Sequence, residues 1–162
     1  MADDPQDQSM PKPNPALGRL NCLIGTWRLE GHTIGSPQQA VVGTATFQWL
    51  HGSVGDSFFL QQDMDLNYAG TPIKSHELIG YNPKTQAFSS LVFSNMAADP
   101  WPYEWDIQGD TWTISIKHGA MDARFTARFA PDRNSFKGHW RPNAGADAQI
   151  NSPYDISGSR IS

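Results

Sequence analysis

Short runs of alternating apolar and polar residues follow one another from Thr26 to the end of the chain. Turn-forming residues interrupt them at intervals of about eight to twelve residues, the spacing of antiparallel strands joined by tight turns. Gly109-Asp110, for example, places glycine at the first central position of a two-residue hairpin. The pattern predicts ten strands, at residues 26–34, 40–50, 56–66, 73–81, 87–94, 103–108, 111–118, 121–129, 136–141 and 152–161.

Ten antiparallel strands are enough to close a sheet on itself, and closure removes the unpaired sheet edges through which chains aggregate. No run after residue 24 has a helical period. We therefore predict an all-β fold: a single closed antiparallel barrel of about ten strands. Its length of 162 residues fits one domain.

The segment before the first strand differs from the rest. Residues 1–15 contain four prolines and few large apolar groups, so we expect a disordered tail there and the barrel domain over 16–162. A short helix begins the domain, because Pro15 and Gly25 bracket a run whose apolar residues share one helical face, namely Leu17, Leu20, Leu23 and Ile24.

The alternation also predicts which side chains face the interior, where aromatic residues dominate. Four polar residues join them: His51, Gln62, Glu77 and His118. The strand at 73–81 has two similar faces; we favour the register with Glu77 inside, and the alternative places His76 inside. Both inward histidines precede a glycine at an apparent turn, so a solvated position at the barrel rim is the alternative for each.

Composition narrows the function classes. The net charge is −4, and the basic residues are scattered, whereas nucleic-acid binding needs a basic stripe. No stretch approaches the roughly 18 apolar residues of a membrane span, and the polar N-terminus does not resemble a secretory signal, so we expect a cytoplasmic protein. Cys22 is the only cysteine, which excludes an internal disulfide. The five histidines show no metal-ligand spacing, so we expect no metal and no cofactor.

Two short motifs resemble a known group of proteins. The opening Leu-x-x-Leu-x-x-Leu-x-Gly25-Thr26-Trp27 is similar to that of calycin barrels, which include lipocalins, fatty-acid-binding proteins and nitrobindin-like domains. With the segment Glu77-Leu-Ile-Gly-Tyr-Asn-Pro83 it most resembles a bacterial family of uncharacterised function with a calycin-like barrel. The resemblance implies that Trp27 plugs the closed end. Nitrobindin-like domains hold haem through a histidine in the closing strand, and residues 154–161 contain none.

These features lead to three functional hypotheses. The first is a barrel that binds a small, largely apolar or aromatic ligand in its interior, because pockets are mostly apolar with a few placed polar groups. The expected lining is Trp49, Phe58, Gln62, Glu77, Tyr81, Trp105, Trp112, His118, Phe125 and Trp140. A loop at 95–103 containing Trp101 forms either a lid over the open end or a segment packed on the barrel wall.

The second hypothesis is an enzyme on the same barrel, an isomerase, cyclase or lyase in which Glu77 or His118 transfers a proton. No nucleophile elbow, phosphate-binding loop or dinucleotide fingerprint is present. The third is a structural barrel without a ligand, in which residues on outer or ambiguous faces support a homodimer, namely Val42, Leu50, Phe59 and Leu91.

Overall fold

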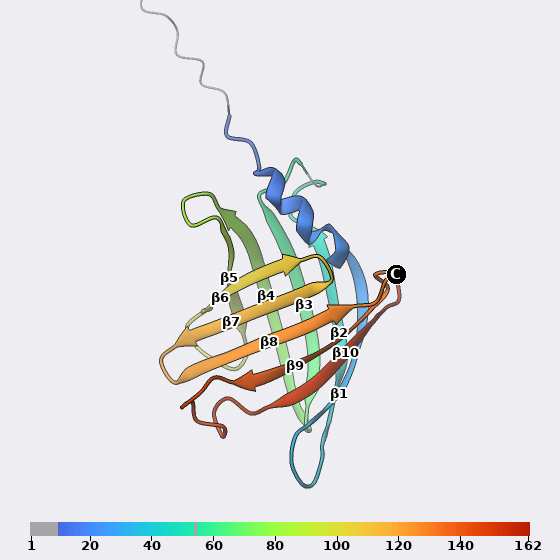
Figure 1. The fold of residues 1–162 in the computed structure, drawn as a ribbon, viewed down its shortest axis with the longest axis vertical. Coiled ribbons are helices and arrows are strands. Elements are labelled where there is room, and N and C mark those ends of the chain that lie inside the picture. The colour runs from blue at the N-terminus through green and yellow to red at the C-terminus, as the bar shows by residue number, and fades with distance from the viewer. Residues whose placement is uncertain (1–9, 54) are drawn as a thin grey trace, which may run out of the picture.

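Ten antiparallel strands close into a barrel in which each strand pairs with its neighbours in sequence, and β1 closes the ring against β10 (Figure 1). The computed structural model describes residues 10–53 and 55–162, so most of the tail expected at 1–15 lies outside the described residues. The elements are η1 (Pro15–Leu23), β1 (Gly25–Thr33), β2 (Ala40–Trp49), β3 (Phe59–Tyr68), β4 (Thr71–Asn82), β5 (Ala87–Ser94), β6 (Trp101–Gln108), β7 (Thr111–His118), β8 (Met121–Phe129), β9 (Ser135–Pro142) and β10 (Tyr154–Arg160).

The predicted fold class and the number of strands are confirmed. The largest difference in boundary lies at β3, which begins three residues later than expected, and several other boundaries differ by two residues, including the start of β6, which comes two residues earlier. Trp101 therefore belongs to a strand, and the connection between β5 and β6 is shorter than the loop expected at 95–103.

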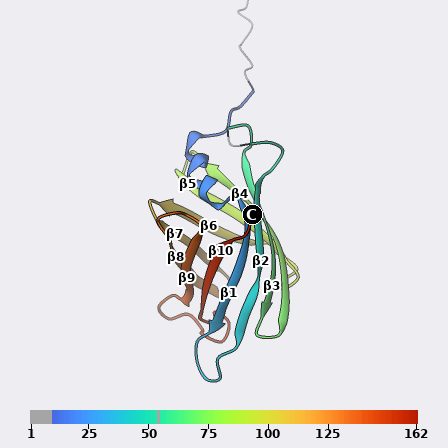
Figure 2. The same ribbon diagram turned by 90° about the vertical axis from the view of Figure 1, so that its right-hand side faces the viewer.

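The N-terminal helix η1 closes one end of the barrel, and the β1–β2 hairpin lies at the opposite end (Figure 2). It is a 3₁₀ helix, begun by Pro15 and by Asn14, whose side chain accepts a hydrogen bond from the backbone of Ala16. A 3₁₀ helix has three residues per turn, so side chains spaced by three are eclipsed on one face. The spacing of Leu17, Leu20 and Leu23 matches that geometry, and all three are buried. These three leucines therefore form a narrow apolar stripe, by which η1 packs into the end of the barrel.

Hydrogen bonds from the side chains of Trp27 and Arg160 hold η1 and the residue after it against the barrel. The indole nitrogen of Trp27, a fully buried residue, donates to the carbonyl of Leu23 at 2.7 Å. The guanidinium of Arg160 lies 4.4 Å from the Trp27 ring and donates to the carbonyls of Ile24 and Cys22. The plugging role expected for Trp27 follows directly from these contacts, since one side chain fills the end of the barrel and holds the helix that covers it.

The half of the barrel next to η1 is packed solid. Large side chains that are fully buried fill it: Leu20, Leu23, Trp27, Leu60, Ile79 and Phe88. Glycines on the inner wall let aromatic rings approach the strands closely. A Cβ at Gly158 would lie 2.2 Å from the Phe136 ring, and one at Gly138 would lie 2.8 Å from the Phe125 ring. Because this packing stops part of the way along the barrel, the other half is left hollow.

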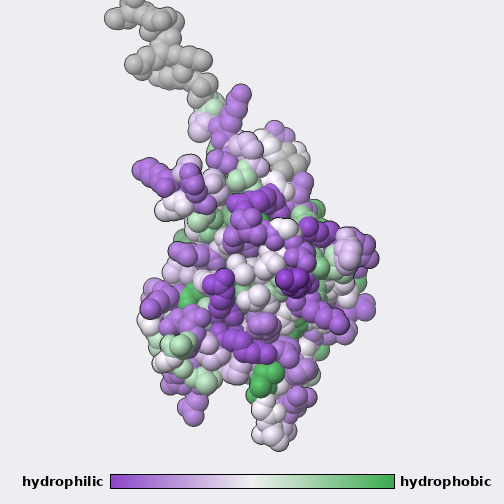
Figure 3. All heavy atoms as spheres, in the orientation of Figure 1, coloured by the Kyte–Doolittle hydropathy of each residue, from purple (hydrophilic) through white to green (hydrophobic). Residues whose placement is uncertain are grey.

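Hydrophilic residues cover most of the outer face seen in Figure 3. Val42, Phe59 and Leu91 point outward and are exposed, as the alternation predicted, and Leu50 is half-buried. Within the described part of the chain, no helix is long and apolar enough to cross a bilayer.

Candidate functional site: an interior cavity

A cavity of about 380 Å³ occupies the half of the barrel away from η1. This volume lies within the range of roughly 300–1,000 Å³ that is usual for small-molecule sites. Its floor is formed by large side chains at the boundary of the packed half, namely Trp27, Phe47, Trp112 and Phe136. The interior is therefore neither a solid core nor an open channel, but a pocket closed at one end.

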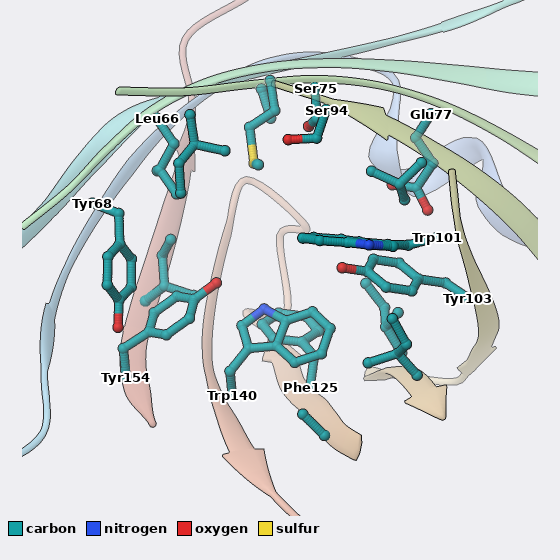
Figure 4. Close-up of a pocket in the computed structure, with 18 of the residues that line it drawn as sticks. Leu66, Tyr68, Ser75, Glu77, Ser94, Trp101, Tyr103, Phe125, Trp140 and Tyr154 are labelled. Atoms are coloured by element: carbon teal, nitrogen blue, oxygen red, sulfur yellow. The ribbon is translucent and has the colours of Figure 1, made fainter. Parts of the chain in front are cut away.

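The two facing walls differ in chemistry (Figure 4). One wall, on β3, β4 and β5, carries polar side chains that lie together because Gln62 is opposite Glu77 and Ser75 is opposite Ser94 in the strand pairing. The facing wall, on β7, β8 and β9, is apolar and includes Trp112, Phe125 and Trp140. An occupant would therefore meet hydrogen-bonding groups on one side and aromatic rings on the other.

The mouth of the cavity lies at the barrel end opposite η1. Met96, in the connection between β5 and β6, and Trp101, the first residue of β6, line it on one side, and residues 149–152 line it from the connection between β9 and β10. The buried side chain of Asn151 anchors the second connection, because it accepts from the backbone of Asp122 at 2.8 Å and donates to the carbonyl of Ala120 at 3.0 Å.

Glu77 is the one acidic side chain among the residues that line the cavity, and only 3% of it is exposed. The hydroxyl of Ser90 donates to its Oε1 atom at 2.6 Å, and the indole nitrogen of Trp105 donates to the same atom at 2.8 Å. Both donors belong to strands β5 and β6 and approach Glu77 from the end of the barrel that η1 closes. The carboxyl is thus held firmly through a single oxygen.

The other oxygen of Glu77, Oε2, faces the cavity. It accepts no hydrogen bond from the described residues. Among these residues, Nε1 of Trp112 is the one side-chain nitrogen or oxygen atom that is both fully buried and without a partner, so Oε2 is not fully buried. Oε2 is therefore reachable by a water-sized molecule, and Figure 4 shows the carboxyl directed into the interior beside Trp101 and Tyr103.

Burial raises the pKa of Glu77 to about 7, because the apolar surroundings penalise the charged carboxylate. The hydrogen bonds from Ser90 and Trp105 favour the charged form and offset part of that penalty. Near neutral pH the carboxyl is consequently divided between two states. It can donate a proton from Oε2 in one state and accept a hydrogen bond or a positive charge there in the other.

Two tyrosine hydroxyls also face the cavity without a hydrogen-bond partner among the described residues. These are the hydroxyls of Tyr103 on β6 and Tyr154 on β10, and both point inward in Figure 4. Burial raises the pKa of each, and the charge of Glu77 raises that of Tyr103 further. Both therefore remain neutral hydroxyls that can donate to an occupant.

Arg141 is the only basic side chain among the lining residues, and its charge is already engaged. Its guanidinium donates to Asp155 at 2.5 Å and to the carbonyls of Trp140 and Tyr154 at 2.9 and 3.0 Å. Among the described residues that line the cavity, none is therefore a free cation that could balance a Glu77 carboxylate.

Half of the lining predicted from the sequence meets at this cavity: Gln62, Glu77, Trp112, Phe125 and Trp140. The register that places Glu77 inside is the observed one, and His76 lies outside, 2.7 Å from Asp63.

Three other residues of the predicted lining are buried or half-buried elsewhere in the barrel. Trp105 lies behind Glu77 and positions it. Trp49 and Tyr81 belong to the closed end, where the Trp49 indole donates to Asn21 and Tyr81 packs against Phe88.

Three residues expected to face inward do not. Phe58 precedes β3 and is 41% exposed, because β3 begins only at Phe59. His118 ends β7 and is exposed, so the rim alternative holds for it and it does not reach the cavity. His51 lies beyond β2 with a φ of 58° and is exposed for the same reason. Phe58 and His51 lie outside the paired residues of β3 and β2, whereas His118 is the last paired residue of β7, opposite Met121 at the rim of the barrel.

The sequence did not point to several residues of the site. Ser90 lies behind Glu77, between Phe88 and Val92 on the buried face of β5, and a serine in that alternation is the signal that could have identified it. Tyr154 and Ser152, which line the cavity, come from the closing segment of the chain. The sequence predicts a loop at Trp101, which is instead the first residue of β6.

Comparisons with known proteins bear on the fold. The sequence profile of a family described as "Protein of unknown function (DUF1579)" matches residues 12–130. Among solved structures, the crystal structure of Rv2717c from M. tuberculosis is similar, with a TM-score of 0.59 and 13% sequence identity over 93% of this chain and 99% of that one. At this identity the likeness concerns the fold alone. No curated protein matches the sequence.

Proposed function

Because the chain belongs to this family, whose description states no activity, we propose a function from the cavity: the protein binds a small, largely apolar or aromatic molecule inside the barrel. The observation that carries the proposal is the Oε2 atom of Glu77, which faces the cavity, can be reached by a water-sized molecule and has no hydrogen-bond partner among the described residues. A hydrogen bond from an occupant to this carboxyl would contribute roughly 1.5–3 kcal/mol when the carboxyl is charged.

The shape of the interior supports the same proposal. Side chains fill one half of the barrel and leave the other half hollow, although the lining aromatics are large enough to pack together. A filled interior would have favoured the hypothesis of a purely structural barrel, and the cavity is an argument against that hypothesis. We also propose that the barrel is calycin-like, since a helix and Trp27 close one end and the cavity opens at the other.

Native mass spectrometry tests the proposal. The purified protein is measured intact and again after denaturing extraction, and we expect a bound small molecule in the first spectrum that is released in the second. Protein that is free of any such mass, and whose tryptophan fluorescence does not respond to a panel of apolar and aromatic compounds, would contradict it. The tryptophans Trp101, Trp112 and Trp140 line the cavity, so occupancy should change their emission.

A second candidate function is proton transfer by Glu77 during an isomerisation, cyclisation or elimination. The observation that favours it is a carboxyl with a pKa of about 7 and one oxygen open to the cavity, because a general acid or base works best when its pKa is near the working pH. His118 cannot take this role in the cavity, since it is exposed at the end of β7. Turnover of a candidate substrate that Glu77→Gln leaves unchanged would exclude this function.

A further inference from the structure

We propose that the molecule bound in the cavity carries a protonated amine, held by Oε2 of Glu77 and by the faces of the surrounding aromatic rings. This inference rests on the proposed binding function and names the chemical class of the ligand. It rests on three features of the cavity: the free carboxyl oxygen, the shortage of other charge, and the aromatic surroundings.

The first feature is the way in which Glu77 is held. Ser90 and Trp105 both donate to Oε1 from the closed side, at 2.6 and 2.8 Å, and leave Oε2 directed at the cavity. Two donors on one oxygen stabilise a carboxylate, and neither of them blocks the second oxygen. A ligand N–H group could therefore bond to Oε2 without displacing any contact within the protein.

The second feature is charge. A buried carboxylate needs a positive partner, since an isolated buried charge is costly. The only basic residue of the lining, Arg141, is paired with Asp155 and two backbone carbonyls near the mouth. A cationic ligand would supply the partner that the protein lacks. An anionic ligand would meet the carboxyl and find no free cation.

The third feature is the set of rings around the carboxyl. Trp101 and Tyr103 lie beside Glu77 and Trp140 lies across the cavity (Figure 4). The faces of aromatic rings carry negative partial charge, so they attract an ammonium group and do not favour an anion. The same rings offer apolar surface to the rest of the molecule. The combination fits an amine attached to an aromatic or aliphatic body.

Three matched probes test this inference: naphthylethylamine, naphthylethanol and naphthylacetate, which share one ring system and differ in the charge of the end group. Each is titrated into the full-length protein by calorimetry at neutral pH. We expect the amine to bind about ten- to a hundredfold more tightly than the alcohol, the range for a hydrogen bond to a charged group. We expect the carboxylate to bind most weakly.

Glu77→Gln should abolish the preference for the amine, because its amide keeps an oxygen that can accept from Ser90 and Trp105 but carries no charge. Glu104→Gln is the matched control, since Glu104 is exposed on the outer face of β6, which is separated from β4 by β5, and should leave the preference intact. A preference that survives Glu77→Gln would overturn the inference.

Proton release gives an independent measurement. Around Glu77, β3 contributes the amide of Gln62, β5 the hydroxyl of Ser90, and β6 Tyr103, whose pKa is raised above its ordinary value. Glu77 is therefore the group whose protonation a cation would change. Calorimetry in two buffers of different ionisation enthalpy should show that amine binding releases a proton below pH 7 and none well above it.

The outcomes of the probe series separate the two proposals. Equal binding of amine and alcohol, or tighter binding of the carboxylate, would overturn the inference and leave interior binding supported. Absence of binding by all three probes would count against both. Because this comparison needs only the wild-type protein, it does not depend on whether the Glu77 variant folds.

Discussion

Replacing Glu77 by glutamine should change the way in which stability depends on pH. The folded protein holds this carboxyl at a pKa of about 7, whereas the ordinary value is 4.5. Between these values the folded state binds more protons than the unfolded state, so the free energy of unfolding falls as pH rises. The contribution is fully present below pH 4.5 and is lost as pH rises through 7.

The size of the loss follows from the difference between the two pKa values. At 1.36 kcal/mol for each pH unit, the wild-type protein should lose about 3 kcal/mol of stability between pH 4.5 and pH 8 through this one residue. Glutamine does not ionise over this range. The difference in unfolding free energy between Glu77→Gln and wild type should therefore move by about 3 kcal/mol in favour of the variant, or roughly 6–12 °C in Tm for a domain of this size.

Urea unfolding at several pH values between 4.5 and 8.5 measures this difference directly. All other ionisable groups are shared by the two proteins, so their contributions cancel in the comparison. Glu104→Gln, on the exposed outer face of β6, should give a difference from wild type that hardly varies with pH. A pH-independent difference for Glu77→Gln as well would refute the claim that burial raises the pKa of this carboxyl.

Three further variants test other parts of the structure. Ser90→Ala removes a donor that favours the charged form of Glu77 and so raises its folded-state pKa, and the pH-dependent loss of stability should therefore extend to higher pH in the same urea series. Leu20→Ala in η1 should lower the free energy of unfolding by about 2–5 kcal/mol, because Leu20 is fully buried, and an unchanged urea midpoint would show that the helix does not plug the barrel. Gly158→Ala should cost about 1–3 kcal/mol by forcing a methyl group against the Phe136 ring, measured as a lower Tm in thermal unfolding followed by circular dichroism.

The sequence predicted the barrel well, because its signals are local. Alternation identifies strands wherever one face is buried, and turn residues mark the breaks. The same rule placed Glu77 inside from a weak contrast between two faces, and the pairing of Gln62 with Glu77 shows that the register was right. It failed at Phe58, because alternation does not indicate where pairing begins, and at His118, because alternation does not show that the end of a paired strand lies at the exposed rim.

Other features could not be read from one sequence. Whether aromatic residues fill a barrel or surround a cavity depends on how strands from all parts of the chain curve together. Trp105 and Trp112 have the same inward orientation, yet the first supports Glu77 from the closed side and the second forms part of the floor. The donors that hold Glu77 come from β5 and β6, and their convergence on one oxygen is a property of the three-dimensional fold.

The pairing of the first strand with the last has a consequence for the order of folding. Trp27 pairs with Arg160, and the backbone of Thr26 bonds to that of Ser162, so one side of β1 is completed by residues that lie far away along the chain. Contacts between such distant positions slow folding, because a long loop must close before they form. Until β10 reaches β1, the sheet stays open with an unpaired edge on β1. The cavity can therefore form only in the last step, when the two strands meet and the open sheet becomes a barrel.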